Sequence, residues 1–395
     1  MLKSSGYVLI AKLLIAGLNF TSIIIISRWL GPVERGVCSW YLVVIAVSLV
    51  FSEMIAGPAA GFLLRDYGEK QVRFISYVWA IITSIITTGF FFFLHKIESF
   101  EWLILFVLCW LNAANSLHLH LLLARQQIKR FNGLAVFIPA AVIICLVIFF
   151  IAGFTSRISY LYSLLIAWSV AFFMGKRLLK KFLNVQPPGN SIRQLIRDGF
   201  KNGIANQASH LAGLLNSRMI FFILPATILG VYSNALSLAE ASLMIPGSFG
   251  QVMYASILNE KNKQGSARKA RQTWWLSIAS LTLVFLMVVI IPDQFYQAIF
   301  GKAFEGVKSH LIFLSAAMIF FGGYLIMSYW QSANGRFIQN FYAHLAAVAV
   351  NGIMSLAFFL TGNYSIKNGI LALGSGYIIL CIVSVFQFRS EQKSR

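Results

Sequence analysis

The chain has 395 residues, of which 58% are hydrophobic and only 11% charged, and its mean hydropathy is +0.77. A soluble domain normally carries about 25% charged residues, so this composition excludes a water-soluble fold and predicts an integral membrane protein. The net charge is +20, from 32 Lys and Arg against 12 Asp and Glu. In a membrane protein such an excess is typical of basic cytoplasmic loops, and we expect no nucleic-acid partner.

Clusters of residues that carry enzyme chemistry are not found in the sequence. The cysteines form no CxxC pair, so neither a metal site nor a disulfide framework is indicated. No phosphate-binding loop or nucleotide fingerprint occurs either. We therefore expect no cofactor, no metal and no catalytic residue, and a protein that is not an enzyme. The four cysteines lie in apolar stretches at Cys38, Cys109, Cys145 and Cys381.

Apolar stretches divide the chain into twelve segments, each near the roughly 20 residues that a membrane helix needs. The first stretch contains Lys12 and is followed by no small-residue cleavage site, so we expect a retained helix rather than a signal peptide. Gly57-Pro58 in the second stretch and Pro246-Gly247 in the eighth predict bent or broken helices. The stretches fall near residues 7–30, 37–64, 74–95, 102–124, 134–154, 158–175, 199–223, 231–258, 274–292, 309–331, 339–360 and 369–387.

The basic residues between these stretches predict the orientation. With the N-terminus inside, the inner segments hold 23 Lys and Arg and the outer segments hold seven, while Lys12 and Arg218 complete the 32. Cytoplasmic loops of membrane proteins carry the excess of Lys and Arg. Both termini are therefore expected in the cytoplasm, and the bias also supports an even number of crossings.

The longest inner loop lies at the midpoint of the chain. It covers residues 176–198, is basic and contains Pro187-Pro188-Gly189. We interpret it as a cytoplasmic linker between two bundles of six helices, one formed by residues 1–175 and the other by residues 199–395. The predicted fold class is thus an all-α membrane protein.

The two halves share a short sequence pattern. Gly36-Val37-Cys38-Ser39 opens the second stretch, and Gly230-Val231-Tyr232-Ser233 opens the eighth, 194 residues later. Each follows a turn with a proline, Leu30-Gly31-Pro32 or Leu224-Pro225. We interpret the halves as parallel repeats about an axis along the membrane normal, an architecture that places a central cavity between them.

Three short segments resemble polysaccharide transporters, and the likeness extends over nearly the whole chain in helix number and loop placement. They are Ser27-Arg28-Trp29-Leu30-Gly31-Pro32 with Gly36, Gly230-Val231-Tyr232-Ser233-Asn234-Ala235, and Phe300-Gly301-Lys302-Ala303-Phe304. The chain is similar in this respect to the Wzx-type flippases of the multidrug/oligosaccharidyl-lipid/polysaccharide exporter superfamily.

This resemblance implies two six-helix bundles around a central cavity in the bacterial inner membrane. It implies that an undecaprenyl-diphosphate-linked oligosaccharide is flipped for O-antigen (lipopolysaccharide), capsule or exopolysaccharide biosynthesis. The implied partners are this lipid-linked substrate, membrane lipids, a coupling ion (proton or sodium) and a polysaccharide polymerase. Many relatives carry an acid directly after the arginine of the seventh helix, whereas Met219 follows Arg218 here.

Polar residues follow one face of the seventh stretch. They recur at steps of mostly three or four residues, which places them on one side of a helix, and such a face is costly in lipid. We expect Asn202, Asn206, His210 and Asn216 to line the cavity and bind substrate, and the alternative is interhelical hydrogen bonding. The full set is Asn202, Asn206, Ser209, His210, Gly213, Asn216 and Ser217.

Two cations lie within the predicted spans. Lys12 shares a face with Ser5 and Asn19 at heptad spacing, and we expect Lys12 and Asn19 to bind the anionic headgroup. Lys12 lies roughly 8 Å inside the cytoplasmic end of its helix, so snorkelling to the interface is the alternative. Arg218, beside Asn216, is expected to contact substrate or act in gating, with snorkelling again the alternative.

Two acids lie deep in the spans, Glu53 in the second stretch and Glu240 in the eighth. Each occurs in the helix after a basic one, at roughly matching depth. We expect the pairs Lys12–Glu53 and Arg218–Glu240. Each pair is either a structural ion pair or a proton or cation site coupled to opening and closing.

Further polar residues surround these acids. Ser233 and Ser237 share the predicted helix face of Glu240, which favours an aqueous lining there. His118 and His120 are two residues apart, so they point to different sides of a helix and cannot form an i,i+4 metal pair. We expect them to be hydrogen-bonding residues rather than a proton relay.

Two other functions stay open. A drug/cation antiporter of the same superfamily should carry deep acids to bind its cation, and the first stretch contains none. A membrane glycosyltransferase, polysaccharide polymerase or ligase would need a larger outer loop than residues 293–308. That loop offers Asp293 and Glu305 as paired acids, besides Glu98 and Glu101.

Overall fold

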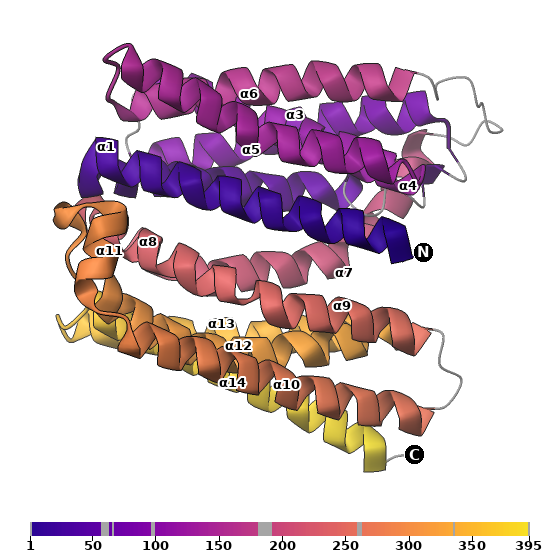
Figure 1. The fold of residues 1–395 in the computed structure, drawn as a ribbon. Coiled ribbons are helices and arrows are strands. Elements are labelled where there is room, and N and C mark those ends of the chain that lie inside the picture. The colour runs from indigo at the N-terminus through magenta and orange to yellow at the C-terminus, as the bar shows by residue number, and fades with distance from the viewer. Residues whose placement is uncertain are drawn as a thin grey trace. The chain divides into compact units, whose positions relative to one another are not determined.

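The computed structural model is helical throughout the residues that it describes (Figure 1), which confirms the predicted all-α membrane fold. Two compact units make up the chain, Met1–Gln207 and Ala208–Arg395. The described residues are 2–56, 63–64, 67–95, 99–180, 192–258, 263–334 and 336–393.

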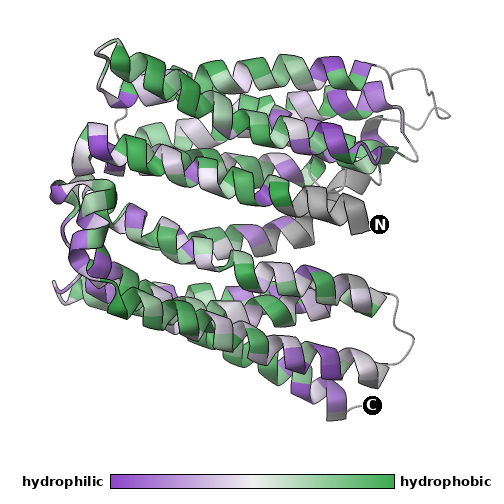
Figure 2. Ribbon diagram, in the orientation of Figure 1, coloured by the Kyte–Doolittle hydropathy of each residue, from purple (hydrophilic) through white to green (hydrophobic). Residues whose placement is uncertain are grey.

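The first unit is built around α4. This helix contacts α1, α3 and α6, while α5 packs against α1 and α6. Figure 2 shows hydrophobic residues along the middle of these helices and hydrophilic residues toward their ends. The unit contains α1 (Leu2–Ala56), α3 (Glu69–His95), α4 (Ser99–Ala124), α5 (Ile128–Ile151), α6 (Arg157–Leu179) and the first part of α7 (Ile192–Arg218).

The predicted linker is shorter than expected at both ends. α6 continues to Leu179 and α7 begins at Ile192, so the outer parts of the 176–198 segment are helical. Pro187-Pro188-Gly189 lies outside the described residues.

α1 consists of two helical segments that meet at Gly31. This glycine has φ 75° and ψ 177°, a left-handed value that a residue with a Cβ rarely adopts. Pro32 follows it and cannot donate a hydrogen bond to the preceding turn. The apolar part of α1, Ile10–Ile55, has 46 residues. Its length is about 70 Å, more than twice the roughly 30 Å hydrocarbon core, so α1 supplies two crossings.

The second unit is built around α12, which contacts α8, α9, α10 and α14, while α13 packs against α14. In the first unit α4 has a comparable central place, with contacts to α1, α3 and α6. The unit contains the end of α7, η2 (Met219–Phe222), α8 (Ala226–Ser242), α9 (Met244–Leu258), α10 (Lys263–Ile290), α11 (Asp293–Phe300), η3 (Lys302–Phe304), α12 (Val307–Ala333), α13 (Phe337–Leu360) and α14 (Ile366–Lys393).

The predicted break in the eighth stretch is present. α8 ends at Ser242 and α9 begins at Met244. Pro246 lacks the N–H that a continuous helix would donate to the carbonyl of Ser242, which explains the interruption four residues before the proline. Gly57-Pro58, the other predicted break, lies outside the described residues.

Ten helices among the described residues are long and apolar enough to cross a membrane, with α8 and α9 counted together as Ile228–Tyr254. α7 is not among them because polar residues occur on almost every turn. Counting α1 twice and adding α7 gives the twelve predicted crossings. α7 is therefore the crossing that depends most on protein or water, rather than lipid, to cover its polar face.

Candidate functional site

Arg218 and Glu240 form an ion pair in the second unit. Two hydrogen bonds join them, Arg218 Nη1 to Glu240 Oε1 at 2.8 Å and Nη2 to Oε2 at 3.2 Å. The guanidinium carbon also lies 5.8 Å from the ring centroid of Phe221, a cation–π distance. The side chains keep 24% and 37% of their surface exposed. The expected pair is thus present, and it is not sealed from its surroundings.

The polar residues beside this pair are satisfied within the protein. Ser233 Oγ donates to the carbonyl of Gly230 at 2.9 Å, and Ser237 Oγ donates to the carbonyl of Ser233 at 2.8 Å. Ser233 is buried. The expected aqueous lining is therefore not supported at Ser233, because its hydroxyl hydrogen bonds back to its own helix, as serines in membrane helices often do.

Asn216 is buried, with 1% of its surface exposed. Its carbonyl and side-chain oxygens accept hydrogen bonds from Asn351 Nδ2 at 2.7 and 2.9 Å. Ser355 in turn donates to Asn351 Oδ1 at 3.2 Å. This geometry matches the alternative of interhelical hydrogen bonding between α7 and α13, and nothing in it supports the predicted contact of Asn216 with substrate.

Glu53 lies at the centre of a polar cluster in the first unit. Ser116 Oγ donates to Glu53 Oε1 at 2.6 Å, and His120 Nε2 lies 3.6 Å from the same oxygen. Gln207 Nε2 lies 3.5 Å from Glu53 Oε2. The cluster joins α1, α4 and the part of α7 that belongs to this unit. It brings a carboxylate and an imidazole together inside a membrane bundle, where ionisable groups are rare.

The two histidines of α4 have different surroundings. His118 is fully buried, hydrogen bonds with the hydroxyl of Tyr77 and stacks on Phe172, with ring centroids 5.3 Å apart. It packs against Gly175 of α6, where a Cβ would overlap the imidazole. His120 instead faces Glu53 and keeps 29% of its side-chain surface exposed. The predicted hydrogen-bonding role fits His118, whereas His120 belongs to the polar cluster around Glu53, which the sequence did not reveal.

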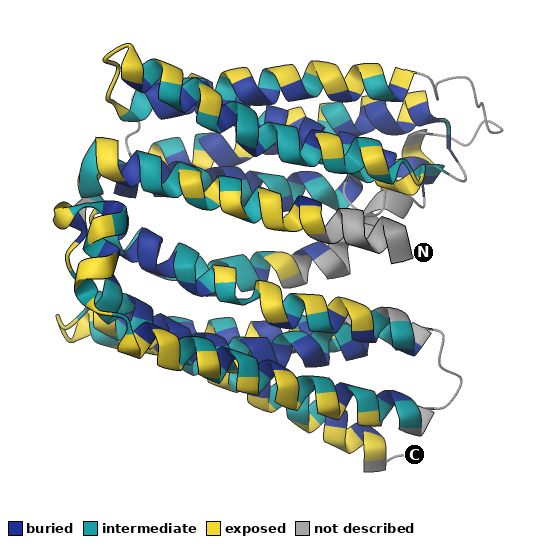
Figure 3. Cartoon of the chain, in the orientation of Figure 1, coloured by how far each residue is buried: buried dark blue, intermediate teal, exposed yellow. Residues whose placement is uncertain are grey.

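Of the remaining residues predicted to bind substrate, the structure describes the side chains of three. Lys12 and Asn19 are exposed on the first segment of α1, whose exposed residues are visible in Figure 3. His210 is exposed on α7. The side chains of Asn202 and Asn206 lie outside the described residues. The pair Lys12–Glu53 stays a prediction.

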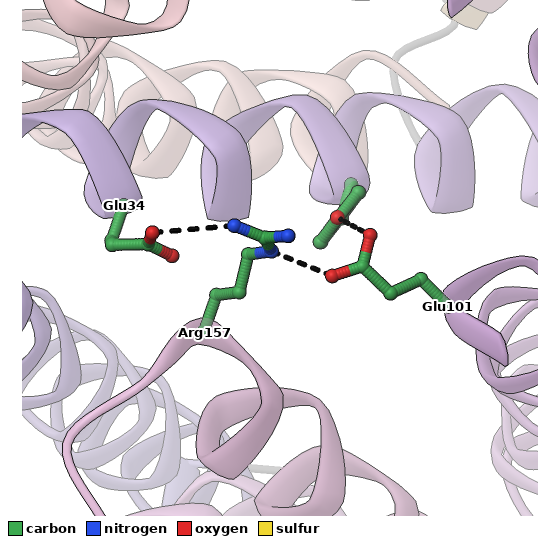
Figure 4. A network of polar contacts seen from close by, with 4 residues as sticks. Glu34, Glu101 and Arg157 are labelled. Atoms are coloured by element: carbon green, nitrogen blue, oxygen red, sulfur yellow. Dashed lines mark hydrogen bonds and ion pairs between the residues drawn. The ribbon is translucent and has the colours of Figure 1, made fainter. Parts of the chain in front are cut away.

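A charged cluster lies at the end of the first unit where α1 turns. Arg157 of α6 lies between two carboxylates (Figure 4), with Nε 2.6 Å from Glu101 Oε1 and Nη1 3.3 Å from Glu34 Oε1. Tyr41 donates to Glu101 Oε2 at 2.6 Å. Glu101 is buried. The sequence assigned Glu101 and Arg157 to loops, so their contact was not predicted.

The acids that an outer catalytic pair would use have other roles. Glu101 is occupied by Arg157 and Tyr41, and Asp293 accepts a hydrogen bond from Gln297 of its own helix at 2.8 Å. Glu98 lies outside the described residues. Glu101 and Asp293 thus have partners of their own among the described residues, and the alternative of a polymerase or ligase stays open.

Comparison with known proteins identifies a sequence family and several similar solved structures. The sequence model of a family described as “Polysaccharide biosynthesis protein” matches residues 1–257, more than half of the chain. A comparison with curated protein sequences gives no significant match. Among solved structures, the lipid II flippase MurJ in an inward closed conformation is similar, with 15% identity, a TM-score of 0.76, and coverage of 98% of this chain and 88% of that one.

Two transporters are also similar in structure. One is an inward-facing multidrug resistance MATE family transporter of the MOP superfamily, with 12% identity, a TM-score of 0.72, and coverage of 95% and 94%. The other is a mutant of the Vibrio cholerae MATE transporter VcmN, with 14% identity, a TM-score of 0.67, and coverage of 100% and 96%. At these identities the likeness shows a shared fold.

Proposed function

Because the chain belongs to the polysaccharide biosynthesis protein family, we propose that it is a flippase for undecaprenyl-diphosphate-linked oligosaccharide. It carries the repeat units of O-antigen, capsule or exopolysaccharide across the bacterial inner membrane by alternating access. Its substrate is handed to a polysaccharide polymerase. The resemblance of the fold to MurJ and to MATE transporters supports transport by two moving bundles.

The observation that carries this proposal is the partly exposed ion pair of Arg218 and Glu240 within the spanning part of the chain. A charge at this depth is costly and normally marks a substrate or ion pathway. The Arg218 side chain keeps 24% of its surface exposed, and in this proposal its guanidinium contacts a diphosphate while Glu240 holds it in place. Lys12 of α1 supplies a second exposed cation.

The polar residues of α1 and α7 complete the proposed substrate site. Asn19 and His210 are exposed and bind sugar hydroxyls or phosphate oxygens. Asn202 and Asn206 are assigned to the same site from their spacing in the sequence. Asn216 supports the site from behind through Asn351. The finer assignment of these residues rests on the polar pattern of the helices.

Glu53 is proposed as the coupling site, together with His120. The carboxylate accepts a hydrogen bond from Ser116 and lies 3.6 Å from the imidazole. Binding of a proton changes the charge of this cluster and therefore the attraction between α1 and α4. Such a change biases a two-state bundle toward one conformation. Glu240 acts in gating through its contact with Arg218.

A drug/cation antiporter is the second candidate, favoured by the similarity to MATE transporters. The two functions differ in the charge of the substrate. A cationic drug requires an accessible acid, whereas here Glu240 is held by Arg218 and Glu53 is surrounded by Ser116, Gln207 and His120.

The test is to delete the gene in its host and follow the lipid-linked oligosaccharide. Spheroplasts are treated with a membrane-impermeant reagent that oxidises sugars. We expect repeat units to accumulate on their lipid carrier, protected from the reagent, while surface polysaccharide disappears. If the accumulated units are fully exposed outside but not polymerised, the protein acts after translocation as a polymerase or ligase. If repeat units do not accumulate and drug sensitivity rises, the antiporter function applies.

A further inference from the structure

A polar hollow lies at the turn between α13 and α14. Its volume is about 680 Å³, within the range of pockets that hold small ligands. All eight residues that line it are uncharged. The aromatic and hydrogen-bonding side chains that line it are those of Phe358, Thr361, Asn363, Tyr364, Ser365 and Asn368.

The turn that forms this hollow is held in place by its own hydrogen bonds. Asn368 Nδ2 donates to the carbonyl of Asn363 at 2.6 Å, and Ser365 Oγ accepts from the backbone N–H of Asn368 at 3.3 Å, as an N-cap does. Thr361 Oγ1 donates to the carbonyl of Ala357 at 3.0 Å. A site fixed in this way loses little conformational entropy when a ligand binds.

Hydrogen-bonding capacity is left over on the open side of the hollow. The amide of Asn363 is exposed, and both its N–H₂ and its oxygen are available. The oxygen of Thr361 can still accept, and the hydroxyl of Ser365 can still donate. The aromatic residues Phe358 and Tyr364 add apolar surface. Neutral donors and acceptors next to aromatic rings match a sugar ring, which has hydroxyl groups at its edge and C–H groups on its faces.

The position of the hollow fits the outer side of the membrane. α13 begins next to Arg336 and α14 carries Arg389 near its end. The turn at residues 361–365 lies at the opposite end of both helices. Basic residues mark the cytoplasmic end of spanning helices, so the hollow opens on the outer side of this unit.

We propose that this hollow is a binding subsite for a neutral sugar of the transported oligosaccharide. The proposal rests on the function proposed above. It adds a second contact between the protein and the proposed substrate. The diphosphate is bound within the spans, whereas the glycan rests on the outer turn of α13 and α14 after it has crossed. The subsite recognises hydroxyl groups and not the phosphate.

The experiment measures binding of free glycan to the full-length protein in detergent. The probe is the repeat-unit oligosaccharide released from the host's lipid carrier by mild acid, observed by saturation-transfer NMR. Asn363→Ala removes an exposed amide that makes no hydrogen bond in the structure, so the fold is retained. Gln294→Ala removes an exposed amide from α11, outside the hollow, and is the matched control. Thr361→Val is the second test variant.

We expect the native protein and Gln294→Ala to bind the oligosaccharide equally. Asn363→Ala should bind it about fivefold more weakly, the effect of one neutral hydrogen bond, and Thr361→Val should be weaker as well. Inorganic pyrophosphate should not compete. Equal binding by all four proteins, displacement by pyrophosphate, or no binding to the native protein would each overturn the subsite. The spheroplast assay on the deletion strain reports separately on the flippase function, so the two proposals fail independently.

Discussion

Arg218 of α7 and Glu240 of α8 are joined by hydrogen bonds of 2.8 and 3.2 Å, although 22 residues separate them in the chain. The residue directly after Arg218 is the apolar Met219, and the carboxylate that pairs with the guanidinium comes from the next helix. This bidentate geometry fixes the orientation of the guanidinium, while 24% of the Arg218 side-chain surface stays exposed.

Arg218→Ala should lower surface polysaccharide export about tenfold or more, because a hydrogen bond to a charged group contributes about 1.5–3 kcal/mol. Quantification of surface glycan in complemented deletion strains measures this effect. The exchange of the two charges, Arg218→Glu with Glu240→Arg, is the control, since it keeps an ion pair but moves the cation. Export restored by this exchange would show that the pair is structural only.

Glu53→Gln should abolish transport that is driven by a proton gradient and leave downhill exchange of substrate intact. The amide still accepts the hydrogen bond from Ser116 but does not bind a proton, so the fold is kept while coupling is lost. Proteoliposomes with an imposed pH difference provide the measurement. Glu34→Gln, a carboxylate of the Arg157 cluster, is the matched control and should retain coupling.

His120→Gln should give a partial form of the same defect, since His120 contacts Glu53 without being its only polar neighbour. A pH profile of transport in proteoliposomes distinguishes a role of His120 in coupling from a purely structural role. We expect its optimum to move relative to that of the native protein. An unchanged profile with uniformly lower activity would place His120 outside the coupling site.

The twelve crossings and the all-α fold were predictable because lipid leaves so few choices. Within the hydrocarbon core the backbone must satisfy its own hydrogen bonds, so each long apolar stretch becomes a helix. The turn at Gly31-Pro32 and the break before Pro246 followed from the same residues that forbid a regular helix. The pair of Arg218 and Glu240 was predictable because consecutive helices pack together.

The contacts between helices distant in sequence were not predictable. Ser116 lies 63 residues from Glu53, and Arg157 lies 56 residues from Glu101. Such partners are chosen by the packing of whole helices, which hydropathy does not encode. A polar residue in a membrane-spanning helix can either face a water-filled cavity or form a hydrogen bond with another helix. Asn216 does the latter, because it accepts a hydrogen bond from Asn351.

Arg157→Ala should destabilise the first unit more than any change to Glu34. It leaves the buried carboxylate of Glu101 without its cation, and the loss of one partner from a buried pair costs about 3–5 kcal/mol. Thermal unfolding of the detergent-solubilised protein measures this loss. Glu34 is 32% exposed, so Glu34→Gln should change the melting temperature little.

The double variant Arg157→Met with Glu101→Gln separates charge from packing. It removes both charges of the buried pair while it keeps side chains of similar size, and it should recover most of the lost stability. Tyr41 retains an acceptor in the new amide. If the double variant were as unstable as Arg157→Ala, the contribution of Arg157 would come from packing and not from its charge.

Gly175→Ala should destabilise the first unit because the added methyl group would overlap the imidazole of His118. Insertion of a methyl group into a packed core costs about 1–3 kcal/mol. Its effect and that of His118→Ala should not be additive, because the smaller residue at position 118 makes room for the methyl group at position 175. Melting temperatures of the two single variants and the double variant form the cycle. Strict additivity would mean that α4 and α6 do not approach each other at this point as the structure describes.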